Sequence, residues 1–315
     1  MSTSNTKNKL VVILGPTASG KTDLAIKLAL RLRSGRNNFG IKGAEIISAD
    51  SRQVYKGMDI GSGKISKKEM AGVPHYLLSV ANPKTRFSVS QYQKLAIKAI
   101  KNIQKRGKIP FLVGGTGFYI QSIVDGVVVP EVKPDWKLRN KLEKKSNEEL
   151  YKMLLSKDPE RAKTIDKNNP RRLVRALEIV IKTGKPIPQI SHKPRKSESN
   201  ILQIGVAKTP EELKPLIHKR LIKRLKNDAM INEVKKLRKI LSWKRLEEFG
   251  LEYRAVAQYL QDKISYQEMI NQIQKESEQY VKRQITWFKR DKRIVWIKKI
   301  GQADKLVTDF LKKLN

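Results

Sequence analysis

Cysteine is absent from this sequence, which excludes disulfides, thiolate zinc sites and a cysteine nucleophile. A chain without thiols fits a reducing compartment. Histidine is nearly as scarce. His75, His192 and His218 lie far apart in the sequence, without the spacing typical of metal ligands, so we assign them no metal role.

Long apolar runs are also missing. The polar start MSTSNTKNK leads into an apolar run of only about five residues, which is too short for a signal peptide or a membrane span. We therefore expect a soluble, cytoplasmic protein with no membrane attachment.

Acidic side chains are few beside the basic ones. The chain has 67 Lys and Arg against 30 Asp and Glu, for a net charge of +37. Such an excess favours a polyanionic partner, nucleic acid first. A general preference for lysine is the alternative, since the lysines are scattered along the whole chain.

A phosphate-binding motif stands near the N-terminus. The apolar run LVVIL (10–14) leads into GPTASGKT (15–22), which fits G-x-x-x-x-G-K-[ST] at every fixed position, and a helical pattern follows. In this motif backbone N–H groups surround phosphate oxygens, Lys21 supplies a positive charge, and the Thr22 hydroxyl is a ligand for Mg²⁺. The motif predicts a phosphate chain with Mg²⁺ as cofactor, but not which phosphate compound; a glycine turn that binds nothing is the alternative.

The order of the remaining elements predicts an α/β fold with a P-loop NTPase-like parallel sheet. Buried strands are expected at 44–50, 74–80, 109–113 and 201–207, with a short one at 295–297, and an amphipathic helix at 87–108. Helices are also expected at 210–240 and 264–290. Ligands of such sheets lie beyond the carboxyl ends of the strands, where the P-loop, Asp50 and Thr116 fall.

The middle of the chain has a different character. Residues 135–184 are helical and basic, and they lie between the linker DGVVVPEVKPD and a second linker, 185–200, that is rich in Pro, Ser and Lys. We predict an α/β core of residues 1–124 and 201–315 with an all-helical insertion at 125–200.

Several side chains are candidates for chemistry or binding, each with a plainer alternative. Asp50 could accept a proton or hold Mg²⁺ through water, or merely cap a loop. The turn Gly114–Gly117 could offer N–H groups and the Thr116 hydroxyl to a ligand, or serve packing alone. Arg171 and Arg175, one turn apart on a helix, suit RNA phosphates, as does the basic face of helix 276–290; a solvated helix face is the alternative in both places.

Together these segments resemble one family. GPTASGKT, ISADSRQVYKGMDIGSGK, PHYLL, LVGGTGFYI, NNPRRLVRALEI and KRQITWF follow one another as in the tRNA dimethylallyltransferases, also called tRNA isopentenyltransferases. The resemblance runs through nearly the whole chain. It implies a P-loop α/β core with a helical insertion, and transfer of a dimethylallyl group from dimethylallyl diphosphate to N6 of adenosine 37 in the tRNA anticodon stem-loop.

The resemblance also assigns roles to residues. The P-loop would hold the diphosphate leaving group rather than ATP, through Gly15, Pro16, Thr17, Ala18, Ser19, Gly20, Lys21 and Thr22. Asp50 would be the general base, with Thr116 and Lys21 at the reaction site. The expected tRNA contacts are Asp50, Ser51, Arg52, Gln53, Thr116, Arg139, Arg171, Arg172, Arg175, Tyr253, Arg254, Lys282, Arg283, Gln284, Thr286 and Lys289. Glu252 departs from the family, many members of which have glycine there.

Three other functions share part of this pattern. A small-molecule kinase would share the P-loop but need neither the basic insertion nor the charge of +37. A prenyltransferase acting on free adenine nucleotides would share the chemistry but lack the parts that grip tRNA. A non-catalytic P-loop RNA-binding protein would not need Lys21, Thr22, Asp50 and Thr116 together. We also expect a monomer.

Overall fold

The computed structural model describes residues 8–34, 41–127, 130, 132–188 and 200–312. The chain divides into two compact units, one of residues 1–124 with 194–315 and the other of residues 125–193. The C-terminal boundary between them lies within 189–199, outside the described residues.

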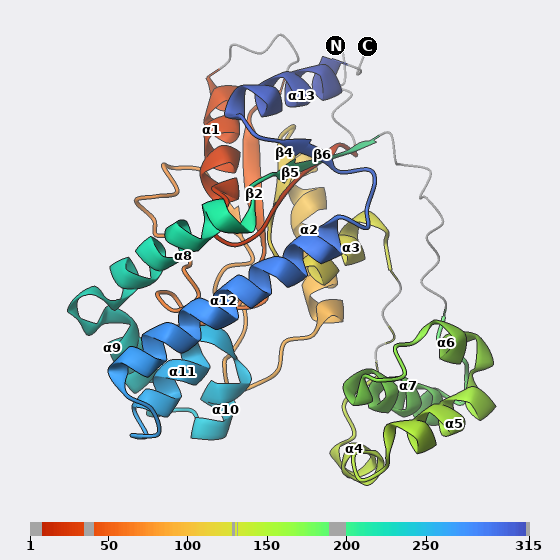
Figure 1. The fold of residues 1–315 in the computed structure, drawn as a ribbon. Coiled ribbons are helices and arrows are strands. Elements are labelled where there is room, and N and C mark those ends of the chain that lie inside the picture. The colour runs from red at the N-terminus through yellow and green to blue at the C-terminus, as the bar shows by residue number, and fades with distance from the viewer. Residues whose placement is uncertain (1–7, 35–40, 128–129, 131, 189–199, 313–315) are drawn as a thin grey trace. The chain divides into compact units, whose positions relative to one another are not determined.

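A six-stranded sheet forms the centre of the first unit (Figure 1). All of its strand pairings are parallel, and the order is β3-β2-β4-β1-β5-β6, so the P-loop strand lies between β4 and β5. This confirms the predicted parallel α/β fold. The strands are β1 (Leu10–Leu14), β2 (Ala44–Ala49), β3 (His75–Tyr76), β4 (Ile109–Gly114), β5 (Ile201–Val206) and β6 (Val295–Ile297).

Strand β3 is much shorter than the expected strand at 74–80. The backbone leaves the extended conformation directly after Tyr76, because Leu77 and Ser79 adopt positive φ angles of 63° and 54°. Such angles are incompatible with a continuing strand.

Helices cover both faces of the sheet, which is why its central strands are apolar throughout. Along β1, Val12 and Leu14 pack in one core cluster and Val11 and Ile13 in the other, since successive side chains point to opposite faces. The helices that follow the first three long strands are α1 (Lys21–Arg33), α2 (Val89–Lys105) and α3 (Gly117–Val124).

The C-terminal part of the first unit is helical. The expected helix at 264–290 is confirmed as α12, which has a Ser265 capping box at its start. The expected helix at 210–240 is broken, because Asn227 and Asp228 have positive φ angles between α8 and α9. The helices here are α8 (Pro210–Leu225), α9 (Ala229–Arg238), α10 (Trp243–Glu248), α11 (Leu251–Tyr259), α12 (Tyr266–Phe288) and α13 (Ile300–Lys312).

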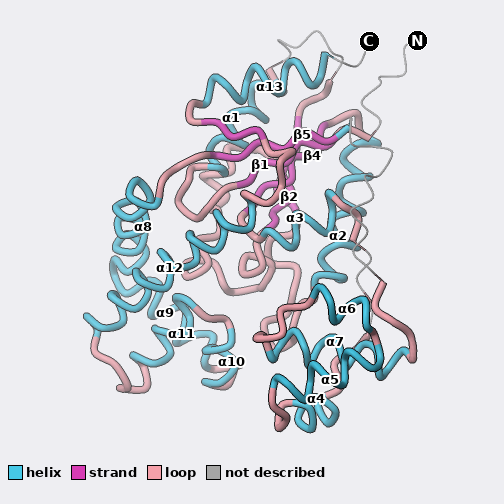
Figure 2. The backbone as a smooth tube through the Cα atoms, turned by 45° about the vertical axis from the view of Figure 1, so that its right-hand side comes forward, coloured by secondary structure: helices cyan, strands magenta, loops and turns pink. Residues whose placement is uncertain are grey.

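The second unit is a small helical bundle with its own core (Figure 2). Leu150 and Leu154 of α5 and Leu173 and Leu177 of α7 are fully buried there. Its helices are α4 (Trp136–Leu142), α5 (Asn147–Lys157), α6 (Pro159–Thr164) and α7 (Pro170–Thr183). In the described parts of both units, every helix is too short or too polar to span a membrane.

Candidate functional site

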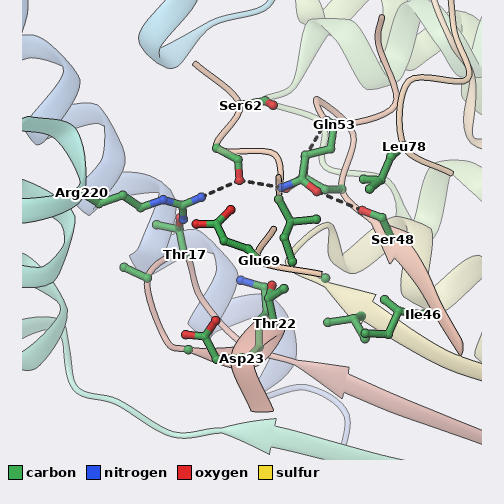
Figure 3. Close-up of a pocket in the computed structure, with 18 of the residues that line it drawn as sticks. Thr17, Thr22, Asp23, Ile46, Ser48, Gln53, Ser62, Glu69, Leu78 and Arg220 are labelled. Carbon is green, nitrogen blue, oxygen red and sulfur yellow. Dashed lines mark hydrogen bonds between the residues drawn. The ribbon is translucent and has the colours of Figure 1, made fainter. Parts of the chain in front are cut away.

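A cavity of about 420 Å³ opens at the carboxyl ends of β1, β2 and β4 (Figure 3). The P-loop and the first turn of α1 form one part of its lining, the segment 61–69 another, and α8 a third. Apolar side chains complete it. The lining residues include Thr17, Lys21, Thr22, Ile46, Ser48, Asp50, Gln53, Ser62, Gly63, Ile65, Glu69, His75, Leu78, Val113, Lys219, Arg220 and Lys223.

The P-loop has the backbone that phosphate binding requires. Gly20 caps α1 in the left-handed conformation at φ 85°, and Ala18 is also left-handed at φ 61°. The first N–H groups of a helix have no partner within the helix, so this end of α1 suits an anion. The Ser19 hydroxyl is buried there without a hydrogen-bond partner in the described part of the chain.

Positive side chains gather around this loop. Lys21 Nζ donates a hydrogen bond to the Pro16 carbonyl at 3.0 Å. Burial of its ammonium and the nearby charge of Arg220 lower the pKa of Lys21 to about 8, although the charge of Asp50 acts in the opposite direction. Arg220 comes from α8, and its guanidinium donates to the Gly63 carbonyl at 2.9 Å. A dianion or trianion in the cavity would relieve the repulsion between these two cations.

Asp50 follows the last residue of β2, and its carboxylate is oriented by a tight turn. One oxygen, Oδ1, accepts N–H groups from Arg52 at 2.8 Å and Gln53 at 3.3 Å. Its other oxygen has no hydrogen bond within the described residues. Asp50 therefore presents an oriented acceptor that lines the same cavity as Lys21 and Thr22.

The turn Gly114–Gly117 is fastened to the end of β2. The Thr116 N–H donates to the Ala49 carbonyl at 3.1 Å, and the Thr116 hydroxyl accepts the Ser51 N–H at 3.0 Å. A side chain at Gly114 would clash, because its Cβ would lie 2.2 Å from the Ala49 carbonyl oxygen. The structure therefore brings Thr116 and Asp50 to one edge of the sheet, as the sequence predicts.

Two of the expected tRNA contacts are buried instead. The Tyr253 hydroxyl donates to Glu233 at 2.8 Å and accepts the Ser62 N–H at 3.1 Å, and the side chain is only 1% exposed. Gln284 is 5% exposed, and its amide bonds to Thr17 and Gly115. These positions do not fit direct tRNA contact, because neither polar group faces solvent.

Glu252, the departure from the family pattern, forms an ion pair with Arg224 at 2.9 Å. Arg224 also donates to the Gly61 carbonyl at 2.7 Å. The Arg224–Glu252 ion pair therefore helps to hold the start of segment 61–69, which lines the cavity. Arg254 is half-buried and lies 3.6 Å from Glu276.

The arginines of the second unit divide into two kinds. Arg139 and Arg175 both bond to the carboxylate of Glu178, which is fully buried. Arg171 and Arg172 are exposed. The expectation that Arg171 and Arg175 share an exposed face is therefore wrong for Arg175, because the guanidinium turns inward to neutralise Glu178.

The C-terminal part of α12 has the predicted arrangement of one buried apolar face and one exposed basic face. Val281 and Phe288 are buried, and the opposite side presents exposed basic and polar side chains. The exposed residues expected to contact tRNA are Lys282, Arg283, Thr286 and Lys289.

Arg220 and Tyr280 are two site residues that sequence reasoning missed. Arg220 is one basic residue among many in α8, so no motif marks it. Tyr280 of α12 lies near Thr116 and Asp50, and burial together with the charge of Asp50 raises the pKa of Tyr280 to about 12. Only its position next to KRQITWF could have drawn attention to it.

Comparison with known proteins gives consistent matches. The family model described as "IPP transferase" matches residues 53–291. The chain is 38% identical to the tRNA dimethylallyltransferase of Halothermothrix orenii, over 96% of this chain and 93% of that one. It is 41% identical to that of a Thermoanaerobacter species, over 91% of each chain.

Solved structures resemble the fold over similar lengths. The tRNA isopentenylpyrophosphate transferase from Bacillus halodurans superposes with a TM-score of 0.69 and 34% identity, covering 98% of both chains. A eukaryotic dimethylallyltransferase described as acting on tRNA superposes with a TM-score of 0.75 and 27% identity, covering 96% of this chain and 77% of the other.

Proposed function

Since the chain belongs to the IPP transferase family, which contains the tRNA dimethylallyltransferases, we propose that it moves a dimethylallyl group from dimethylallyl diphosphate to N6 of adenosine 37 in tRNA. One observation supports this most: a P-loop with Lys21 and an oriented Asp50 line the same cavity. The first suits a diphosphate leaving group, and the second suits removal of a proton.

The diphosphate is assigned to the P-loop end of the cavity. Its oxygens would accept hydrogen bonds from the N–H groups at the start of α1 and from the side chains of Lys21 and Arg220. As the bond between the allylic carbon and oxygen breaks, its electron pair passes to the diphosphate. These groups stabilise the growing negative charge. The apolar side chains of Ile46, Leu78 and Val113 line the same cavity and suit the five-carbon group.

Asp50 is assigned to the adenine amine that accepts the dimethylallyl group. The exocyclic amine of adenine is a weak nucleophile, so its proton must leave as the new C–N bond forms. The unbonded oxygen of Asp50 would take that proton. Adenosine must leave its stack to enter the cavity, which costs less in the single-stranded anticodon loop than in a stem.

Mg²⁺ is assigned to the diphosphate of the substrate that donates the dimethylallyl group. The Thr22 hydroxyl is a hard oxygen ligand that lines the cavity, while Asp50 is assigned to proton removal. The described residues contain no group of three or more acidic or histidine side chains placed to hold a metal ion, so diphosphate oxygens and water would complete the shell. When bound, the ion adds positive charge beside the leaving group.

The remaining assignments concern partners. We assign the anticodon stem to the exposed basic residues, Arg171 and Arg172 in the second unit and the Lys282–Lys289 face of α12 in the first. We also propose that the protein works as a monomer in the cytoplasm.

The test is incubation with dimethylallyl diphosphate, Mg²⁺ and unmodified tRNA, followed by mass spectrometry of the nucleosides. Adenosine carrying one five-carbon unit is the expected product. A parallel reaction with AMP as the acceptor tests for a prenyltransferase that acts on free adenine nucleotides. A parallel reaction with ATP tests for a small-molecule kinase. Prenylated AMP without prenylated tRNA would indicate the free-nucleotide enzyme, and phosphoryl transfer from ATP would indicate a kinase.

A further inference from the structure

Helix α12 joins the two sides of the site through one buried side chain. Gln284 lies near the end of α12 that packs against α3 (Figure 1). Its Oε1 accepts the N–H of Thr17 in the P-loop at 2.9 Å, and its Nε2 donates to the carbonyl of Gly115 at 2.8 Å. One amide therefore bridges the loop assigned to the diphosphate and the turn that carries Thr116.

The chemistry of this bridge suits a carboxamide. Thr17 offers a donor and Gly115 an acceptor, so the bridging group must accept at one atom and donate at the other. Gly115 also needs to be glycine, because a Cβ there would lie 2.3 Å from the Gln284 nitrogen. The amide is 5% exposed and both of its polar ends are occupied, so leaving either backbone group unpaired would carry a desolvation cost.

The bridge continues to the proposed base. From Gly115 the chain runs to Thr116, which bonds to Ala49 and Ser51 on either side of Asp50. Tyr280, one turn before Gln284 on the same helix, lies close enough to the Thr116 side chain to interact with it electrostatically. Helix α12 thus bonds to the turn at Gly115 and to the P-loop at Thr17 through Gln284, and it places Tyr280 beside Thr116.

We propose that Gln284 is a positioning residue, which sets the spacing between the leaving diphosphate and the acceptor amine. The proposal rests on the proposed function, since it assigns the two substrates to the two loops that the amide joins. Bond formation between two bound substrates depends steeply on their separation, and a misplacement of about 1 Å can cost about 10²-fold in rate. Loosening the bridge should therefore slow the transfer while each loop keeps its own binding groups.

The decisive variant is Gln284→Glu, which keeps the acceptor for Thr17 but sets a second oxygen against the Gly115 carbonyl. Gln279→Glu is the matched control, because it makes the same change at an exposed position of the same helix. We expect the single-turnover rate of Gln284→Glu to fall about 10²-fold at saturating substrates. The KM for tRNA and the dissociation constant of inorganic diphosphate should both stay within about threefold of those of Gln279→Glu.

A second variant covers the case in which Gln284→Glu does not fold. Gln284→Met has a similar length, carries no charge and loses both hydrogen bonds, and we expect the same fall in rate. Amide hydrogen exchange at Thr17 should accelerate in this variant, whether or not substrates are present.

Two results would overturn the proposal. One is a wild-type transfer rate in both variants. The other is a raised KM for tRNA with an unchanged rate at saturation, which would make Gln284 a direct tRNA contact. If the wild-type protein itself prenylates no tRNA, the proposed function fails, while the hydrogen-exchange comparison still shows whether Gln284 joins the two loops.

Discussion

Asp50 and Lys21 interact electrostatically across one cavity, and the proposed function assigns each to a different half of the reaction. The charge of Asp50 supports the ammonium of Lys21, which burial and Arg220 disfavour. The carboxylate itself is oriented by the N–H groups of Arg52 and Gln53. A change at either residue should therefore separate proton removal from diphosphate binding.

Asp50→Asn keeps the shape of the side chain and removes its basicity. If Asp50 is the general base, kcat should fall by about two to four orders of magnitude. Binding of tRNA and of dimethylallyl diphosphate with Mg²⁺ should change little. If Asp50 instead serves mainly to hold the metal, the variant would bind diphosphate weakly and excess Mg²⁺ would restore activity. Titrating the activity of the variant against Mg²⁺ separates the two roles.

The lowered pKa of Lys21 predicts that anion binding depends on pH. Its pKa is lowered to about 8, so the free protein loses this positive charge as the pH rises through 8. The dissociation constant of inorganic diphosphate should therefore rise about tenfold between pH 7 and pH 9 beyond any change in Lys21→Arg. The arginine stays charged in this range, so the variant also cancels the titration of diphosphate itself. Parallel profiles for the two proteins would contradict a Lys21 ammonium that binds the anion and titrates near pH 8.

Residues at fixed spacing could be predicted from the sequence, and residues set by tertiary contacts could not. The P-loop, Asp50 and Thr116 were found because each ends a strand or fills a motif position. Arg220 and Tyr280 were missed because they reach the site from helices distant in the sequence. Arg175 was misjudged for a related reason: helical periodicity shows a face, not the buried carboxylate that pairs with it.

Helix α7 illustrates how a basic helix can be internally stabilised. Glu178 is fully buried, and it accepts hydrogen bonds from Arg139 at 2.8 and 2.7 Å and from the Asp135 N–H at 2.7 Å. Burial would raise the pKa of its carboxyl, but Arg139, the Asp135 backbone and Arg175 together hold the pKa below its ordinary value of 4.5.

Glu178→Gln should therefore destabilise the second unit by about 3 kcal/mol, because two arginines lose their buried partner. Hydrogen exchange of the α7 amides measures this directly. Glu148→Gln is the control, since Glu148 and its partner Lys152 are both largely exposed, and it should cost less than about 1 kcal/mol. Because the folded-state pKa of Glu178 is depressed, its contribution is present above pH 4.5 and lost as the pH falls below that value. Equal exchange in the two variants would contradict this account.

Helices and strands with strong periodicity were predicted well. The helix expected at 87–108 forms as α2, Val89–Lys105, where Ser88 and Gln91 make a capping box. The break between α8 and α9 was missed, because its cause is the left-handed backbone of Asn227 and Asp228 rather than a glycine or proline. Turn conformations of this kind depend on tertiary packing that a hydrophobic pattern does not encode.

The net charge of the whole molecule should control how the affinity for tRNA depends on salt. With a net charge of +37, tRNA binding should weaken steeply as salt increases, because each phosphate contact releases a counterion. Replacing the exposed Arg171 and Arg172 together by alanine should lower the slope of log K against log salt by about 1.5. Filter binding across a salt series gives the slope. An unchanged slope and affinity would make this end of α7 a solvated face.

The most direct measurement of the proposed reaction is transfer of labelled dimethylallyl groups into two tRNAs that differ at one base. One is an unmodified substrate tRNA with adenosine at position 37, and the other has guanosine there. The wild-type protein with Mg²⁺ should incorporate one group per molecule of the first tRNA and none into the second, and should release one diphosphate for each transfer. Equal incorporation into both tRNAs, or diphosphate release without incorporation, would contradict the proposed acceptor and the function built on it.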